Sequence, residues 1–156
     1  MAAFETKIRH QRISFSPFTG EQMNAIATVA LKSIIARIKS GTDSNDSPAK
    51  ELAPWYKAYK QNYAKKYGLS VVGIRDWTLS GRTLASAKVK LASEDHAVIG
   101  FIDGYLNRKI TVNNLVAKQN RMSPMWGLSP KDMEAVYAEV IRQITVRSPI
   151  QIEQVA

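Results

Sequence analysis

The chain has 156 residues, 45% of them hydrophobic, and it carries 22 Lys and Arg against 13 Asp and Glu, a formal net charge of +9. This length suits one sizeable core, so we expect a single domain over residues 1–156. The absence of cysteine excludes disulfides, thiolate catalysis and thiolate metal sites. The positive charge predicts a surface that attracts anions: nucleic acid, an anionic membrane or an acidic protein.

A membrane span or signal peptide is not expected. No stretch approaches the roughly 20 consecutive apolar residues of a spanning helix, and residues 1–10 lack the apolar core of a signal peptide. We therefore expect a protein that stays in the cytoplasm unless an assembly carries it out, and no membrane partner.

Residues 1–17 predict a strand or arm, because Phe4, Thr6 and Ile8 alternate with charged residues as in an edge strand. A first helix follows. Thr19 with Gln22 forms a capping-box pattern, and Gly41 supplies the stop. Apolar residues recur at helical spacing between them: Met23, Ile26, Ala27, Ala30, Leu31, Ile34 and Ile38.

The sequence around the end of the first helix predicts charges that stabilise the helix and an exposed loop after it. Arg37 and Lys39 fall in the last turn, where cations oppose the negative end of the helix dipole. Residues 41–48 are almost all turn formers and predict an exposed connection that could be mobile.

Residues 53–68 predict a helix with a stripe of rings on one face, from the spacing of Tyr56, Tyr59, Tyr63 and Tyr67. Lysines spread around the remainder: Lys57, Lys60, Lys65 and Lys66. Tyrosines on one stripe favour packing against a core or a partner protein. The alternative is that the lysines hold phosphates while the rings stack on bases.

The second half of the chain predicts a hairpin and two more helices. After a short helical turn over residues 79–85, alternation over residues 88–91 and 97–102 predicts two strands joined by a turn at residues 93–96. Residues 106–117 keep helical spacing, and residues 120–128 form a loop.

The last helix has a clear start signal, with Ser129 as N-cap, Pro130 in the first turn and Asp132 three residues after the cap. Its predicted apolar face is Met133, Val136, Tyr137, Val140, Ile141 and Ile144. It should end before Ser148, leaving residues 148–156 as a C-terminal tail. The predicted fold class is α+β: a small antiparallel sheet packed with two or more long amphipathic helices, with extended termini.

The sequence contains no complete catalytic motif. Gly68 and Gly73 have the spacing of a phosphate-binding loop, but the Lys and the Ser or Thr that hold phosphate and magnesium do not follow. Residues 94–96 could bind a metal or act as a base, and Asp76 beside Arg75 could be half of an acid/base pair. Turns select such residues, so we favour a polar hairpin turn and a local ion pair. We predict a protein that is not an enzyme and holds no metal or cofactor.

Three segments follow one another in the second half of the chain: IRDWTLSGRTLASAKV (74–89), AVIGF (97–101) and MWGLSPKD (125–132). Their order and spacing, within a similarity over residues 25–144, resemble the virion-morphogenesis family of tailed phages, also called tail-completion or head–tail joining proteins. Trp77 departs from this pattern, because an aliphatic residue is more usual there. The ends, up to Phe18 and after Arg147, have no counterpart in the family.

The resemblance implies a structural protein of the virion neck or tail end, made in the host cytoplasm, which completes the tail and docks it to the DNA-filled head. It also implies a homo-oligomeric ring, a hexamer or dodecamer, beside neck, portal-adaptor or tail proteins and packaged DNA. The interface residues that we expect are Tyr59, Tyr63, Trp77, Arg82 and Trp126. Trp126 is open to two interpretations, a core plug or an interface anchor. The alternative function is a small basic DNA-binding protein that uses Lys57, Lys60, Lys65 and Lys66.

Overall fold

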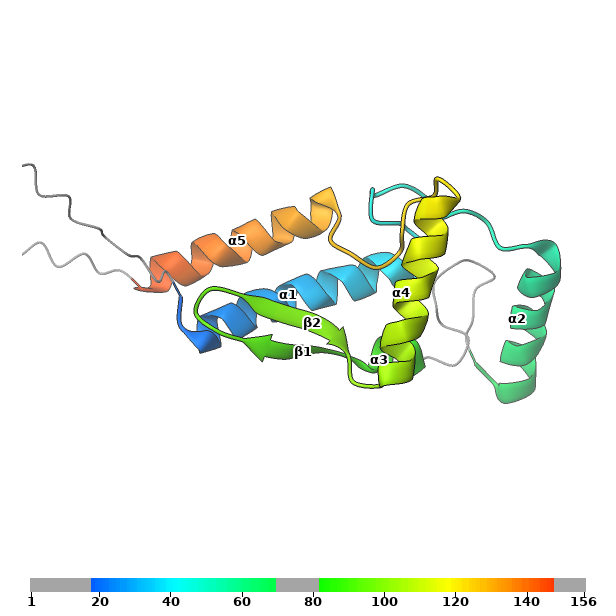
Figure 1. Ribbon diagram of the computed structural model, residues 1–156, viewed down its shortest axis with the longest axis horizontal. Helices are drawn as coiled ribbons and strands as arrows, with labels where there is room; N and C mark the ends of the chain where they lie inside the picture. The colour runs from blue at the N-terminus through cyan, green and yellow to red at the C-terminus, as the bar shows by residue number, and fades with distance from the viewer. Residues whose placement is uncertain (1–17, 70–81, 148–156) are drawn as a thin grey trace, which may run out of the picture.

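The computed structural model describes residues 18–69 and 82–147, which form an α+β structure around one central helix (Figure 1). The elements are α1 (Gly20–Lys39), α2 (Pro54–Tyr67), α3 (Arg82–Ala85), β1 (Ala87–Ala92), β2 (Ala97–Phe101), α4 (Gly104–Gln119) and α5 (Pro130–Arg147). The two antiparallel strands pack on one side of α1, and α5 lies along another side of it. The predicted fold class is therefore confirmed.

Some predictions fall outside the described residues: the strand over residues 4–15, the pair Arg75 and Asp76, Trp77 and the tail over residues 148–156. Within the described parts of the chain, no helix combines the length and apolar character that crossing a bilayer requires.

The central helix α1 begins where its capping box predicts. Thr19 Oγ1 accepts a hydrogen bond from the backbone N–H of Gln22 at 3.2 Å, and Gln22 Oε1 accepts one from the N–H of Thr19 at 2.9 Å. These bonds satisfy donors that have no partner within the helix. Its buried apolar residues, two of them alanine, let the hairpin and α5 both approach the helix: Ile26, Ala27, Ala30, Ile34 and Ile38.

The predicted hairpin is confirmed, but it contains a β-bulge that the sequence pattern does not reveal. Val89 pairs with Ile99 and Leu91 pairs with Val98, so Lys90 has no opposite residue. Plain alternation would place Leu91 on the same half-buried face as Val89; the inserted residue moves it to the opposite face, where it is exposed.

Asn107 of α4 closes the outer edge of β2. Its Nδ2 donates to the carbonyl oxygen of Phe101 at 2.6 Å, and its Oδ1 accepts from the Phe101 N–H at 3.1 Å. The side-chain amide thus satisfies the two backbone groups that a neighbouring strand would otherwise pair. This contact fixes the predicted helix α4 against the end of the hairpin.

Two buried apolar clusters form the core and share two neighbours. One cluster joins α1, α3 and the loop before α5: Ile34, Ile38, Leu84 and Met125. The other joins the hairpin and α4: Ala87, Phe101, Leu106 and Ile110. Ile35 and Trp126 pack against both clusters, and the Trp126 ring lies 4.4 Å from the Phe101 ring, centroid to centroid. The clusters therefore form one continuous core.

The connection over residues 41–48 is tighter than the predicted exposed loop. Asp43 is buried, and its Oδ1 accepts from the backbone N–H groups of Asn45 and Ser47 at 2.8 and 3.1 Å. The N–H of Ser44 also donates to the carbonyl oxygen of Pro124 at 2.9 Å. The turn formers do make a turn, but a distant loop fixes its position.

Candidate interaction surfaces

The tyrosine helix predicted over residues 53–68 is present as α2. Pro54 occupies the first turn, where its missing N–H costs nothing, and Gly68 ends the helix in the left-handed conformation with φ 62°. The four tyrosines form a continuous row, with ring centroids 6.1 Å apart from Tyr56 to Tyr59, 6.2 Å from Tyr59 to Tyr63 and 4.5 Å from Tyr63 to Tyr67. Trp55 extends the row, with its ring 5.5 Å from that of Tyr56.

Much of this row is open to solvent. The exposed fraction is 73% for Trp55, 50% for Tyr59 and 55% for Tyr67, and Tyr63 is half-buried. Among the described residues, α2 takes no part in the main packing of α1, α4, α5 and the hairpin, and Figure 1 shows it standing apart from them. We name the surface formed by Trp55, Tyr59, Tyr63, Lys66 and Tyr67 the aromatic–basic face.

The four lysines predicted as DNA contacts divide into two groups. Lys57, Lys65 and Lys66 are exposed, whereas Lys60 is only 2% exposed and so does not offer its ammonium group to a ligand at the surface. Lys66 lies over the ring of Tyr67, with Nζ 5.4 Å from the ring centroid, a cation–π contact. Sequence alone could not place Lys60 inside, because lysine is almost never fully buried.

The structure does not gather the other predicted interface residues with Tyr59 and Tyr63. Arg82 is exposed at the start of α3, and Trp126 is half-buried between the two core clusters. Its backbone carbonyl also accepts a hydrogen bond from Asn114 Nδ2 at 3.0 Å. Trp126 therefore packs against the core, as the first of its two interpretations describes, and its role at an interface stays a prediction.

A second exposed apolar surface runs along α5. Of the predicted apolar face, Met133, Val136 and Val140 are half-buried, but Tyr137, Ile141 and Ile144 are exposed. These three lie at positions i, i+4 and i+7, and hence on one line along the helix. We name them the α5 flank. The width of the apolar pattern was a signal for this surface, because six apolar positions exceed what contact with one neighbouring helix covers.

The hairpin turn contains a serine, an aspartate and a histidine, but not in a catalytic arrangement. His96 Nδ1 lies 2.9 Å from Ser93 Oγ and 2.6 Å from Asp95 Oδ1, so the same ring nitrogen faces both groups. A relay needs the two ring nitrogens to face different partners. Hydrogen bonds from Ser93 and then His96 lower the pKa of Asp95, and the residues around the turn are exposed. Among the described residues, no three His, Asp or Glu side chains group as metal ligands.

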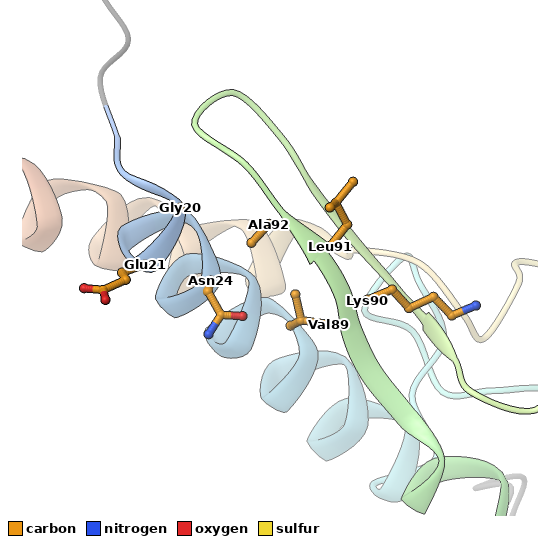
Figure 2. Close-up of a pocket in the computed structure, with 7 residues that line it drawn as sticks. All are labelled: Gly20, Glu21, Asn24, Val89, Lys90, Leu91 and Ala92. Carbon is orange, nitrogen blue, oxygen red and sulfur yellow. The ribbon is translucent and has the colours of Figure 1, made fainter.

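A shallow groove of about 350 Å³ lies between the first turns of α1 and strand β1 (Figure 2). Its lining is Gly20, Glu21, Asn24, Val89, Lys90, Leu91 and Ala92. Glu21 and Lys90 are the ionisable groups in this lining, and Figure 2 shows their side chains pointing away from each other. The groove therefore lacks the convergent polar groups that a reaction site uses.

In comparisons with known proteins, no family model, no curated protein and no solved structure matches the chain.

Proposed function

We propose that this protein is a structural, non-enzymatic component of the phage head–tail junction, and that it works by adhesion to copies of itself and to neighbouring neck, portal-adaptor or tail proteins. The ordered resemblance of residues 74–89, 97–101 and 125–132 to the virion-morphogenesis family supports the location in the particle. The observation that carries the adhesive role is the α5 flank, an apolar line outside the protein's own core.

The α5 flank is suited to contact with a second copy. Tyr137 and Ile141 adjoin half-buried Val140, so a partner surface would extend an apolar layer that already reaches the core. In a ring, such a flank binds a different surface of the next copy, because only a head-to-tail contact repeats around an axis. We therefore propose a ring oligomer, a hexamer or dodecamer, with the aromatic–basic face left for another partner.

The self-association is tested on the purified full chain by sedimentation velocity at increasing concentration. Replacing Tyr137 and Ile141 together by serine should shift the oligomer towards monomer. The matched control is Ala138→Ser, an exposed α5 position next to the flank. Wild-type protein that stays monomeric at high concentration would contradict the proposal.

The role in the particle is tested by electron microscopy of a phage assembly reaction without this protein. Separate filled heads and finished tails are expected, and adding back the purified protein should join them. Absence of the protein from mature particles would contradict a virion role, whatever its behaviour in solution.

A further inference from the structure

We propose that the aromatic–basic face of α2 is a docking site for an acidic, amphipathic segment of another protein. The proposal rests on the proposed function only for the statement that this partner is a component of the phage particle.

The exposed side of α2 presents a row of side chains that suits contact with a partner protein. Trp55, Tyr59, Asn62 and Lys66 follow the spacing i, i+4, i+7 and i+11, which places them on one face of the helix. The rings of Trp55 and Tyr59 both lie against Tyr56, and that of Tyr59 also lies against Tyr63. These contacts restrict their rotamers, so the two side chains lose little conformational entropy when a partner binds. Trp and Tyr are also the residues that contribute most at protein interfaces.

The charge of α2 selects an acidic partner. The helix contains four lysines, three of them exposed, and no Asp or Glu, and its first turn has neither an acidic residue nor a side-chain cap. The positive end of the helix dipole therefore adds to the field of the lysines. Lys66, beside the exposed rings, is placed to pair with a carboxylate at the edge of an apolar contact.

A second copy of this chain fits the aromatic–basic face poorly. The α2 lysines find little complementary charge on a second copy, because the whole chain has a net charge of +9. The helix that carries the α5 flank has charges of both signs, Lys131 and Arg142 as well as Glu134 and Glu139, and Arg142 is already paired with Glu139 at 2.6 Å. This mixed surface complements the all-positive α2 poorly.

Nucleic acid also fits less well than a protein segment. Neighbouring rings contact one another, with centroids 4.5 Å apart for Tyr63 and Tyr67, so successive bases could stack only on the outer faces of the row and not between its rings. Helical spacing places Lys57 and Lys65 on sides of α2 other than the one that carries Tyr59 and Lys66. They do not form the continuous basic track that follows a phosphate backbone.

The test measures binding of three fluorescent probes to the full-length protein by anisotropy. The first is a synthetic amphipathic peptide of about 18 residues, five helical turns, with Leu on one face and Glu elsewhere. The second is the same peptide with Lys in place of Glu. The third is an oligothymidine of about 20 nucleotides, which spans a typical single-strand site. We expect the Glu peptide to bind more tightly than the other two.

Substitutions assign the binding to α2. Replacing Trp55 and Tyr59 together by alanine should weaken the Glu peptide at least about tenfold. Lys66→Ala should weaken it about threefold at low salt and less at high salt. The matched controls lie on α4: Tyr105→Ala, at a ring that is 71% exposed, and Lys109→Ala, at an exposed lysine. These should leave the affinity unchanged. Because every replaced side chain is largely exposed, the variants should fold, which circular dichroism checks.

Three outcomes would overturn this inference: equal affinity for the Glu and Lys peptides, peptide binding that survives the Trp55 and Tyr59 substitutions, or tightest binding to oligothymidine with loss on the same substitutions. The last would establish nucleic acid as the ligand of this face. If the Glu peptide binds most tightly and the α2 substitutions weaken it, while the protein is absent from mature particles, the docking site is supported and the proposed virion role is contradicted.

Discussion

Arg37 of α1 and Asp132 of α5, 95 positions apart in the chain, form a buried ion pair with Arg37 Nε 2.8 Å from Asp132 Oδ2. The same carboxylate oxygen accepts the N–H of Ser129 at 3.0 Å, while Ser129 Oγ accepts the N–H of Asp132 at 3.1 Å. One side chain therefore both caps α5 and attaches it to α1. Together with the rest of the packing between α1 and α5, this contact fixes the orientation of the α5 flank.

The guanidinium group of Arg37 also binds the loops at that end of α1. It donates to the backbone carbonyl oxygens of Thr42 at 3.0 Å, Met125 at 3.2 Å and Gly127 at 2.5 Å. Burial by itself raises the pKa of Asp132, but hydrogen bonds from Ser33, Arg37 and the Ser129 N–H together outweigh it, and the pKa lies below its usual value.

Asp132→Asn should lower the free energy of unfolding by about 3–5 kcal/mol, because it leaves the Arg37 charge buried without a counter-ion. Urea denaturation measures the loss. Glu134→Gln, at an exposed position two residues further along α5, is the control and should change the value by less than about 0.5 kcal/mol. Replacing Arg37 by Met and Asp132 by Leu together should recover part of the loss, since no buried charge remains. A loss below about 1 kcal/mol for Asp132→Asn would contradict the role assigned to the pair.

The same pair predicts a pH dependence of stability. Because the pKa of Asp132 is lowered in the folded state, its contribution is fully present above the unfolded value of about 3.9 and is lost as the pH falls through the folded pKa. The difference in unfolding free energy between the wild type and Asp132→Asn should therefore be constant above about pH 5 and shrink below about pH 4. Urea titrations at a series of pH values measure it. A difference that grows in acid would have the wrong sign for a lowered pKa.

Local signals in the sequence predicted the elements, but not the contacts that orient them. Thr19 with Gln22 and Ser129 with Asp132 mark helix starts within a few residues, and the structure confirms both. The sequence indicates Arg37 only as a cation that opposes its own helix dipole, because nothing in a periodic pattern points to a partner 95 residues away. Side-chain spacing shows which residues share a face, whereas tertiary packing decides which faces are covered.

The candidate interaction surfaces show the same contrast between local sequence signals and tertiary contacts. The tyrosine stripe of α2 followed from spacing, but its exposure depends on α2 standing apart from α1 and the hairpin. Lys60 and Lys66 look alike in the sequence, yet one is buried and the other lies over a tyrosine ring. Six apolar positions on α5 indicate a face wider than one contact covers, but which of them stay exposed depends on how α5 packs against α1.

Phe101→Ala should destabilise the protein by about 3–5 kcal/mol, because it opens a cavity where the two core clusters meet. The Phe101 side chain is almost fully buried against the Trp126 ring. Thermal unfolding measures the change, which should be a fall in Tm of about 2–4 °C per kcal/mol for a chain of this size. The control is Tyr105→Ala, an exposed aromatic four residues later, which should shift Tm by about 2 °C at most. Equal effects from the two substitutions would contradict the position given to Phe101 in the core.

Gly68→Ala should loosen the end of α2 and with it the aromatic–basic face. Gly68 has φ 62°, a conformation that costs a residue with a Cβ about 1–2 kcal/mol, and its N–H and that of Leu69 both donate to the carbonyl oxygen of Ala64. Strain at this cap should speed hydrogen exchange of the Leu69 amide about fivefold or more, because 1 kcal/mol of opening free energy corresponds to about that factor.

The matched control is Gly104→Ala in the first turn of α4, where φ is not positive and a Cβ meets no atom within 4 Å. That substitution should leave the Leu69 exchange rate unchanged and raise stability by about 0.4–1 kcal/mol. If both substitutions have the same effect on Leu69, the left-handed cap does not hold the end of α2, and the orientation of Tyr63, Lys66 and Tyr67 needs another cause.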